Sequence, residues 1–99
     1  MTELTSKQRK QLSSLANTLN PLVIVGGAGV TPSLEEKVAQ CLNAHELIKV
    51  KFNEFKEQKK ELSEALAQKT DSALVRLIGN VAIFYRPSDD EEKRHIILK

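Results

Sequence analysis

The sequence predicts an α/β domain in which helices and strands follow one another in the order α-β-α-β-α-β-β. Three observations support this prediction. Apolar residues recur at helical spacing in three stretches, short β-rich runs lie between them, and a Gly-Asn pair joins two β-rich runs near the end of the chain. The chain has 99 residues, which is enough for one domain with a single core.

The composition is typical of a soluble globular domain with an aliphatic core, because 40% of the residues are hydrophobic and only 4% are aromatic. The single cysteine, Cys41, cannot form an internal disulfide, and no Cys/His cluster has metal-ligand spacing. We therefore expect no metal or other cofactor, and a cytoplasmic location. No run is long enough to span a bilayer, and the N-terminal residues lack the apolar core of a signal peptide.

The formal net charge is only +2, but it is unevenly distributed. Residues 88–99 carry three basic and four acidic side chains, whereas residues 1–87 carry 12 basic and 9 acidic ones. Lys7, Arg9 and Lys10 lie together near the N-terminus. We interpret them as candidate contacts for a polyanion, and a solvated helix face is the alternative.

The first predicted helix begins at Thr5, which forms a capping box with Gln8 three residues later. It ends at Asn20-Pro21, because proline disfavours the α conformation in the residue before it. Its apolar stripe consists of Leu12, Leu15, Ala16 and Leu19.

The stretch from Leu22 to Pro32 predicts a short buried strand, a glycine-rich loop and a helix start, in that order. Thr31 offers a hydroxyl for the N-cap, and Pro32 suits the first helical position. A helix start presents unpaired N–H groups and the positive end of the helix dipole, and glycines let a phosphate approach the backbone. The stretch therefore predicts a phosphate-binding loop, with a simple tight turn as the alternative.

The second helix is predicted to run to about Ala44, with an apolar stripe of Leu34, Val38, Cys41 and Leu42. Cys41 is thereby a core residue rather than a nucleophile. His45 closes the helix and is expected to stabilise its terminal carbonyls, although an acid–base role stays open. In the strand over 47–52 the apolar and basic residues alternate, so Lys49 and Lys51 point to the same side of the sheet.

Asn53 is predicted to cap the third helix, whose inward residues are Leu62, Ala65 and Leu66. A hairpin over 73–86 follows, with the turn at Gly79-Asn80. A regular register pairs Leu74 with Tyr85. Tyr85 is then a core residue or, alternatively, a base-stacking one. We expect the second and third helices on one face of the sheet and the first on the other, a flexible segment over 88–94, and a short edge segment over 96–98.

Four motifs in this order and spacing make the chain similar to the YhbY-like family of the CRM domain, the chloroplast RNA splicing and ribosome maturation module. The motifs are Leu4-Thr5-Ser6-Lys7-Gln8-Arg9, the strand and loop from Leu22 to Thr31, His45-Glu46-Leu47-Ile48-Lys49-Val50-Lys51, and Ile78-Gly79-Asn80 leading to Tyr85-Arg86-Pro87. The resemblance covers residues 4–87. We therefore divide the chain into a CRM domain over 1–87 and a charged tail over 88–99.

This resemblance implies a two-layer to three-layer fold with a four-stranded mixed sheet, similar to the C-terminal domain of bacterial translation initiation factor three. It also implies RNA binding without catalysis and, for stand-alone bacterial members, association with precursors of the large ribosomal subunit. The loop from Gly26 to Gly29 is likened to the loop by which KH domains clamp the nucleic acid backbone. Its second position is often basic in the family, whereas Gly27 and Ala28 occupy the middle here. Neighbouring cations would have to supply the missing charge.

The leading hypothesis is thus a monomeric RNA-binding protein that assists assembly of the large ribosomal subunit. The predicted RNA contacts are Gly26, Gly27, Ala28, Gly29 and Thr31, then Lys7, Arg9 and Lys10, and finally Lys49, Lys51 and Arg86. A protein-interaction adaptor on the ribosome is one alternative, and a nucleotide-binding enzyme is another. The enzyme is disfavoured because Pro32 stands where a dinucleotide fingerprint needs glycine, and no Gly-Lys-Ser/Thr follows the loop.

Overall fold

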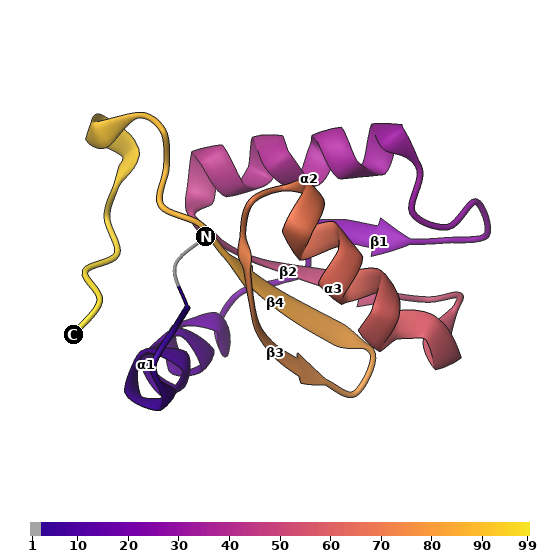
Figure 1. Cartoon of the computed structure of the whole chain (residues 1–99), viewed down its shortest axis with the longest axis horizontal. Coiled ribbons are helices and arrows are strands. Elements are labelled where there is room, and N and C mark those ends of the chain that lie inside the picture. The colour runs from indigo at the N-terminus through magenta and orange to yellow at the C-terminus, as the bar shows by residue number, and fades with distance from the viewer. Residues whose placement is uncertain (1–2) are drawn as a thin grey trace.

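The computed structural model describes residues 3–99, which form one four-stranded sheet with helices on both faces (Figure 1). The elements are α1 (Ser6–Ala16), β1 (Val23–Val25), α2 (Pro32–His45), β2 (Leu47–Phe52), the 3₁₀ turn η1 (Lys56–Gln58), α3 (Lys59–Lys69), β3 (Ala73–Ile78), β4 (Val81–Tyr85) and the 3₁₀ turn η2 (Glu91–Lys93). The predicted order of helices and strands is confirmed.

The strands lie in the order β1-β2-β4-β3, with β1 parallel to β2 and the other pairs antiparallel. The mixed sheet is therefore as predicted. The prediction of a short buried first strand is confirmed for one face only, because β1 is an edge strand that pairs with β2 alone. Val23 and Val25 are buried on its inner face, whereas Ile24 on the other face is 53% exposed.

Two apolar cores lie on opposite faces of the sheet, which confirms the predicted placement of the helices. The larger core packs α2 and α3 on residues such as Val50 and Phe52. The smaller core packs Leu12 and Ala16 of α1 on Leu47, Val75, Ile83 and Tyr85. Tyr85 is buried, so of its two interpretations the structure favours the core residue.

The first helix begins as predicted and ends earlier than predicted. The amide of Gln8 donates to Thr5 Oγ1 at 3.1 Å, and the amide of Thr5 donates to Gln8 Oε1 at 3.0 Å. The helix ends at Ala16, where the amide of Leu19 donates to the Ala16 carbonyl in a tighter 3₁₀-type bond. Leu19 therefore lies outside the helix and is not part of a buried stripe.

The region before α3 does not follow the prediction that Asn53 caps the helix. The amide of Asn53 donates to the Val25 carbonyl at 3.0 Å, and Phe55 adopts a left-handed conformation before η1. The helix then begins at Lys59, without a side-chain cap. Within α3, Ala65 is exposed rather than inward as predicted, whereas Ser63 and Ala67 are buried beside Leu66.

The hairpin has its turn at Gly79-Asn80 as predicted, but its register contains a β-bulge. Leu74 pairs with Phe84 rather than with Tyr85, because Val75 is the extra residue between Leu74 and Arg76. Val75 thereby turns toward the α1 core, while Leu74 packs against the larger core.

The tail packs against the domain rather than forming a flexible segment and an edge strand. Ser88 is fully buried, and η2 follows it. Ile96 and Leu98 pack against the smaller core, and the side chain of Gln11 in α1 bonds to the backbone of Ile97 and Lys99. Because Gln11 of α1 holds the end of the tail beside the smaller core, residues 96–98 do not pair with an edge strand of the sheet.

Candidate nucleic-acid interface

The glycine loop joins the end of β1 to the start of α2, at the right of Figure 1. The amide of Gly29 closes the turn by donating to the Gly26 carbonyl at 3.0 Å. Thr31 Oγ1 accepts from the amide of Leu34 at 3.2 Å, so Thr31 is the N-cap that the sequence predicts. A Cβ placed on Gly26 or Gly27 would meet nothing within 4 Å. The loop backbone is therefore open to a large ligand immediately before a helix N-terminus.

Phe55 lies against this loop and fixes its last residue. Gly29 has φ +74°, and a Cβ there would lie 3.4 Å from Phe55 Cε2. Phe55 is itself in the left-handed region, at φ 56° and ψ 36°, and its side chain is 42% exposed. Such a backbone is uncommon for an aromatic residue and is found where the surrounding structure holds it. The ring thus supports the loop and still presents surface to solvent.

The segment that carries Phe55 completes the site, and the sequence did not reveal it. Residues 53–58 and Gly27 line a shallow hollow of about 460 Å³, with the exposed Lys56 among them. Two acidic residues, Glu54 and Glu57, also line it. Phe55 falls in the segment that the sequence assigns to the start of the third helix, and nothing in its local pattern points to the loop.

The cations of α1 do not surround the loop. Figure 1 shows α1 at the lower left and the loop at the opposite end of the molecule. Lys7 and Lys10 are exposed. Arg9 Nη1 donates to the carbonyls of Leu74 and Val75, at 2.7 and 2.9 Å, and so holds the β-bulge against α1. The structure therefore separates the two groups of predicted contacts.

Lys49 and Lys51 lie on the same face of the sheet as α1, because the residues that alternate with them, Ile48, Val50 and Phe52, face the larger core. Lys49 Nζ donates to the Leu19 carbonyl at 3.0 Å. Lys51 is exposed, and its Cα pairs with that of Ile24 in β1. Of the predicted cations, Lys51 is the one placed at the loop end of the sheet.

Arg86 is directed into the protein. Its Nη1 donates to the Thr70 carbonyl at 2.7 Å, and its Nη2 donates to the Ala39 carbonyl at 3.2 Å. Its Nε is buried and has no partner among residues 3–99. Arg86 thereby connects β4 to α2 and to the end of α3, and its guanidinium is occupied by these internal contacts.

With the loop and its surroundings placed, comparison with known proteins is informative. A model of the CRS1/YhbY (CRM) domain matches residues 4–86. The chain belongs to this family. The family resemblance predicted from four motifs is thereby confirmed.

Relatives and a solved structure agree with this assignment. The chain is 41% identical to an RNA-binding protein of Haemophilus influenzae, over 91% of this chain and 92% of the relative. It is 37% identical to YqeI of Bacillus subtilis, named a probable RNA-binding protein, over 91% of this chain and 95% of the relative. The solution structure of SAV1595 from Staphylococcus aureus, for which RNA binding has been suggested, superposes with a TM-score of 0.77 at 35% identity, covering 96% of this chain and all of that one.

The opposite end of this CRM domain contains a buried carboxylate. Glu46 is 1% exposed, and its oxygens accept from the amides of Ser88, His95 and Ile96 at 2.8, 2.7 and 3.2 Å. Burial raises the pKa of the Glu46 carboxyl, but these hydrogen bonds and the nearby His95 ring outweigh burial and hold the pKa below its ordinary value of 4.5. Burial, and then the Glu46 charge, raise the pKa of Tyr85. Glu46 therefore fastens the tail to the domain, and we call Glu46 with the amides of Ser88, His95 and Ile96 the clasp.

Within residues 3–99, no three His, Cys, Asp or Glu residues are grouped so that they could hold a metal ion. Among the helices described for the chain, none is both long and apolar enough to cross a membrane.

Proposed function

We propose that this CRM-family chain is a non-enzymatic RNA-binding protein that receives the sugar-phosphate backbone of unpaired RNA at the Gly26–Gly29 loop. The observation that carries the proposal is the open backbone of Gly26 and Gly27 directly before the N-terminus of α2. There the loop amides and the helix dipole attract a phosphate, and neither glycine has a side chain that covers the backbone. Glu54 and Glu57 line the neighbouring hollow, where the exposed Lys56 offsets part of their charge. The names of the relatives in Haemophilus influenzae and Bacillus subtilis support RNA as the ligand.

Phe55 gives the loop a second type of contact. Its ring lies on Gly29 and remains partly exposed, beside the position where a phosphate would bind. Aromatic side chains in RNA-binding proteins stack on unpaired bases, which contributes about 1–3 kcal/mol per base. We propose that the base next to the bound phosphate stacks on Phe55.

The charge that this loop lacks comes, in our proposal, from lysines outside it. Lys51 and Lys56 lie at the loop end of the sheet and are exposed, so they contact the nearest phosphates. Lys7 and Lys10 on α1, and Lys49 between them and the loop, contact a longer RNA that continues over the sheet. We assign Arg86 to the fold because its Nη1 and Nη2 both donate to main-chain carbonyls. We also assign Arg9 to the fold because its Nη1 donates to two main-chain carbonyls, although the residue stays exposed.

We further propose that the RNA is ribosomal, in precursors of the large subunit, and that the protein acts as a monomer in the cytoplasm to assist their assembly. This part of the proposal depends on family membership and not on a contact in the structure. In this proposal the CRM domain binds the RNA of the precursor particle directly, whereas a protein-interaction adaptor would bind ribosomal proteins.

Two measurements test the proposal. Binding to single-stranded RNA should weaken with salt, by about 0.7 in log-log slope for each phosphate contacted, and a panel of mononucleotides should bind far more weakly. In sucrose gradients the protein should sediment with large-subunit precursors, and ribonuclease should release it. Salt-independent binding would contradict the phosphate contacts, and sedimentation that survives ribonuclease would favour the adaptor.

A further inference from the structure

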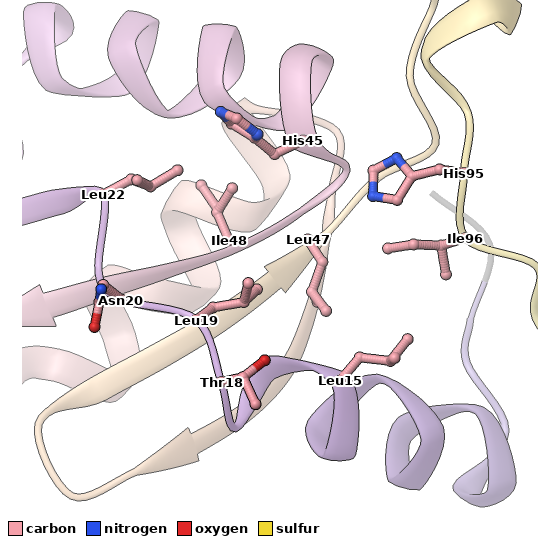
Figure 2. Close-up of a pocket in the computed structure, with 10 residues that line it drawn as sticks. All are labelled: Leu15, Thr18, Leu19, Asn20, Leu22, His45, Leu47, Ile48, His95 and Ile96. Carbon is pink, nitrogen blue, oxygen red and sulfur yellow. The ribbon is translucent and has the colours of Figure 1, made fainter.

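A second cavity lies away from the glycine loop, where the end of α1, the segment leading to β1, the end of α2 and the tail meet (Figure 2). Its volume is about 500 Å³, within the range of small-ligand sites. Leu15, Leu19 and Leu22 line it and are 47%, 38% and 42% exposed. Contiguous exposed leucines of this kind mark a binding surface rather than a solvated one.

The polar groups of this cavity are few, and the ring of His95 already has partners: its Nδ1 lies 3.0 Å from the Lys93 carbonyl oxygen and 3.3 Å from Glu46 Oε1. Figure 2 shows the rings of His45, from the end of α2, and His95, from the tail, on the side of the cavity that faces Leu15 and Thr18 of the α1 end. The exposed side chains of Thr18 and Asn20 also line the cavity. None of the residues that line the cavity is acidic. The cavity thus combines an apolar floor, two imidazole rings, two exposed polar side chains and no acidic lining residue. The nearest carboxylate, that of the buried Glu46, is paired with the His95 ring.

An unpaired nucleobase fits this combination. Bases stack on apolar and aromatic surfaces, histidine included, and are read through hydrogen bonds to their edges. A base also brings a phosphate with it, so an acidic lining would repel it and a lining free of acids does not. Lys49, whose Nζ donates to the carbonyl of Leu19, adds a positive charge at the border of the cavity.

The path from the glycine loop to this cavity is short. Leu22 stands at the start of β1, where its amide donates to the Lys49 carbonyl at 3.1 Å, and Gly26 follows the end of the same strand. Four residues of extended chain span about 13 Å. Because β1 is the edge strand, no neighbouring strand separates the two sites along its outer side. An RNA clamped at the loop therefore needs only a few nucleotides to reach the cavity.

We propose that the cavity lined by Leu15, Leu19, Leu22, Asn20, His45 and His95 receives an unpaired base of the same RNA whose backbone is held at the glycine loop. This inference rests on the proposed RNA binding and extends it, because it gives the protein a site at which the base, and not only the backbone, is recognised.

The first test follows the leucine methyl resonances by NMR while hexaadenosine or hexauridine RNA is added to the full chain, with inorganic polyphosphate as the control. Polyphosphate carries the charge of RNA without its bases. We expect RNA to shift the methyl groups of Leu15, Leu19 and Leu22, and polyphosphate to leave them in place. Shifts of these methyl groups on concentrating the protein alone would mean that a second copy occupies the cavity, and would overturn the inference.

The second test measures hexaadenosine affinity of the variants Leu19→Trp, which fills the cavity, and Asn20→Ala, which removes an edge contact from an exposed turn. We expect Leu19→Trp to weaken binding about ten-fold, the effect of losing one stacked base, with an unchanged salt slope because no phosphate contact is lost. Ile97→Ala, at an 80% exposed aliphatic residue outside the cavity, is the matched control.

The outcomes separate this inference from the proposed function. Wild-type protein that binds hexaadenosine, with Leu19→Trp and Asn20→Ala binding equally well, would overturn the cavity site and leave the loop site standing. Wild-type protein that binds no RNA would overturn both. A folded Leu19→Trp or Asn20→Ala variant with weakened RNA affinity and unchanged polyphosphate affinity supports the base site.

Discussion

The two ends of the sheet use their polar groups in opposite ways. At the loop end, Gly26 and Gly27 expose backbone that no side chain covers. At the other end, the Glu46 carboxylate accepts three main-chain amides, and the Arg86 guanidinium donates to two main-chain carbonyls. The first arrangement leaves hydrogen-bonding capacity for a ligand, whereas the second uses it within the fold.

This contrast teaches that a charged residue in a family motif need not contact the ligand. Arg86 and Glu46 both belong to the stretches that mark the family, yet each is directed into the protein. Substitutions at the open glycines Gly26 and Gly27 should therefore alter binding without altering stability, and substitutions at Glu46 and Arg86 should do the reverse.

The largest effect is expected from the double substitution Gly27→Asp and Ala28→Asp. Two carboxylates in the loop would repel the phosphate, and we expect RNA binding in a mobility-shift assay to be abolished. Because a Cβ on Gly27 meets no atom within 4 Å, the free energy of unfolding should stay within about 0.5 kcal/mol of wild type. The control Gly27→Asn with Ala28→Asn has the same bulk without charge and should retain part of the affinity. Unchanged affinity of the Asp variant would remove the loop from the site.

The next effect concerns stability alone. Arg86→Leu should lower the free energy of unfolding by about 3 kcal/mol, because it leaves the carbonyls of Thr70 and Ala39 without their charged donor. RNA affinity of the folded variant should be unchanged. Urea denaturation measures the first quantity, and Arg76→Leu, at an exposed position on β3, is the control that should change it little. Reduced affinity with full stability would instead make Arg86 an RNA contact.

The clasp should give the stability a specific dependence on pH. The folded-state pKa of Glu46 lies below its ordinary value of 4.5, so the unfolded chain takes up the proton first as the pH falls. The stabilisation is complete above about pH 4.5 and is lost as the pH falls through the folded-state pKa. Glu46→Gln should cost about 2 kcal/mol at neutral pH and progressively less in acid. Urea denaturation of wild type and Glu46→Gln from pH 3 to 7 measures this difference in the free energy of unfolding, with Glu36→Gln at an exposed position as the control. A difference that does not change with pH would contradict the lowered pKa of Glu46.

The sequence predicts well those features that depend on neighbours along the chain. Thr5 and Thr31 cap their helices as expected, because a hydroxyl and the amide it accepts from are three residues apart. The alternation in β2 places Ile48, Val50 and Phe52 in the core because side chains of a strand alternate between faces. The glycine loop is also found in this way.

The features that escape prediction depend on contacts between distant segments. The amides that donate to Glu46 lie 42 to 50 residues away along the chain. The residues next to Glu46 in the sequence therefore do not reveal whether its carboxylate is buried or exposed. The bulge at Val75 depends on Arg9, more than 60 residues earlier. Phe55 contacts Gly29 through a backbone conformation that its sequence does not favour. The half of the candidate site contributed by residues 53–58 was therefore not visible in the sequence.

The smallest effect distinguishes two glycines within the loop itself. Gly29 has φ +74° and lies under Phe55, so Gly29→Ala should cost about 1 kcal/mol through the left-handed backbone that an alanine must adopt. Gly27→Ala, with open space and an ordinary φ, should cost almost nothing. For a domain of this size 1 kcal/mol lowers the melting temperature by about 4–8 °C, which thermal unfolding resolves. Equal melting temperatures for the two variants would mean that Gly29 is not held at positive φ in the free protein, and that the loop takes this shape only when a ligand binds.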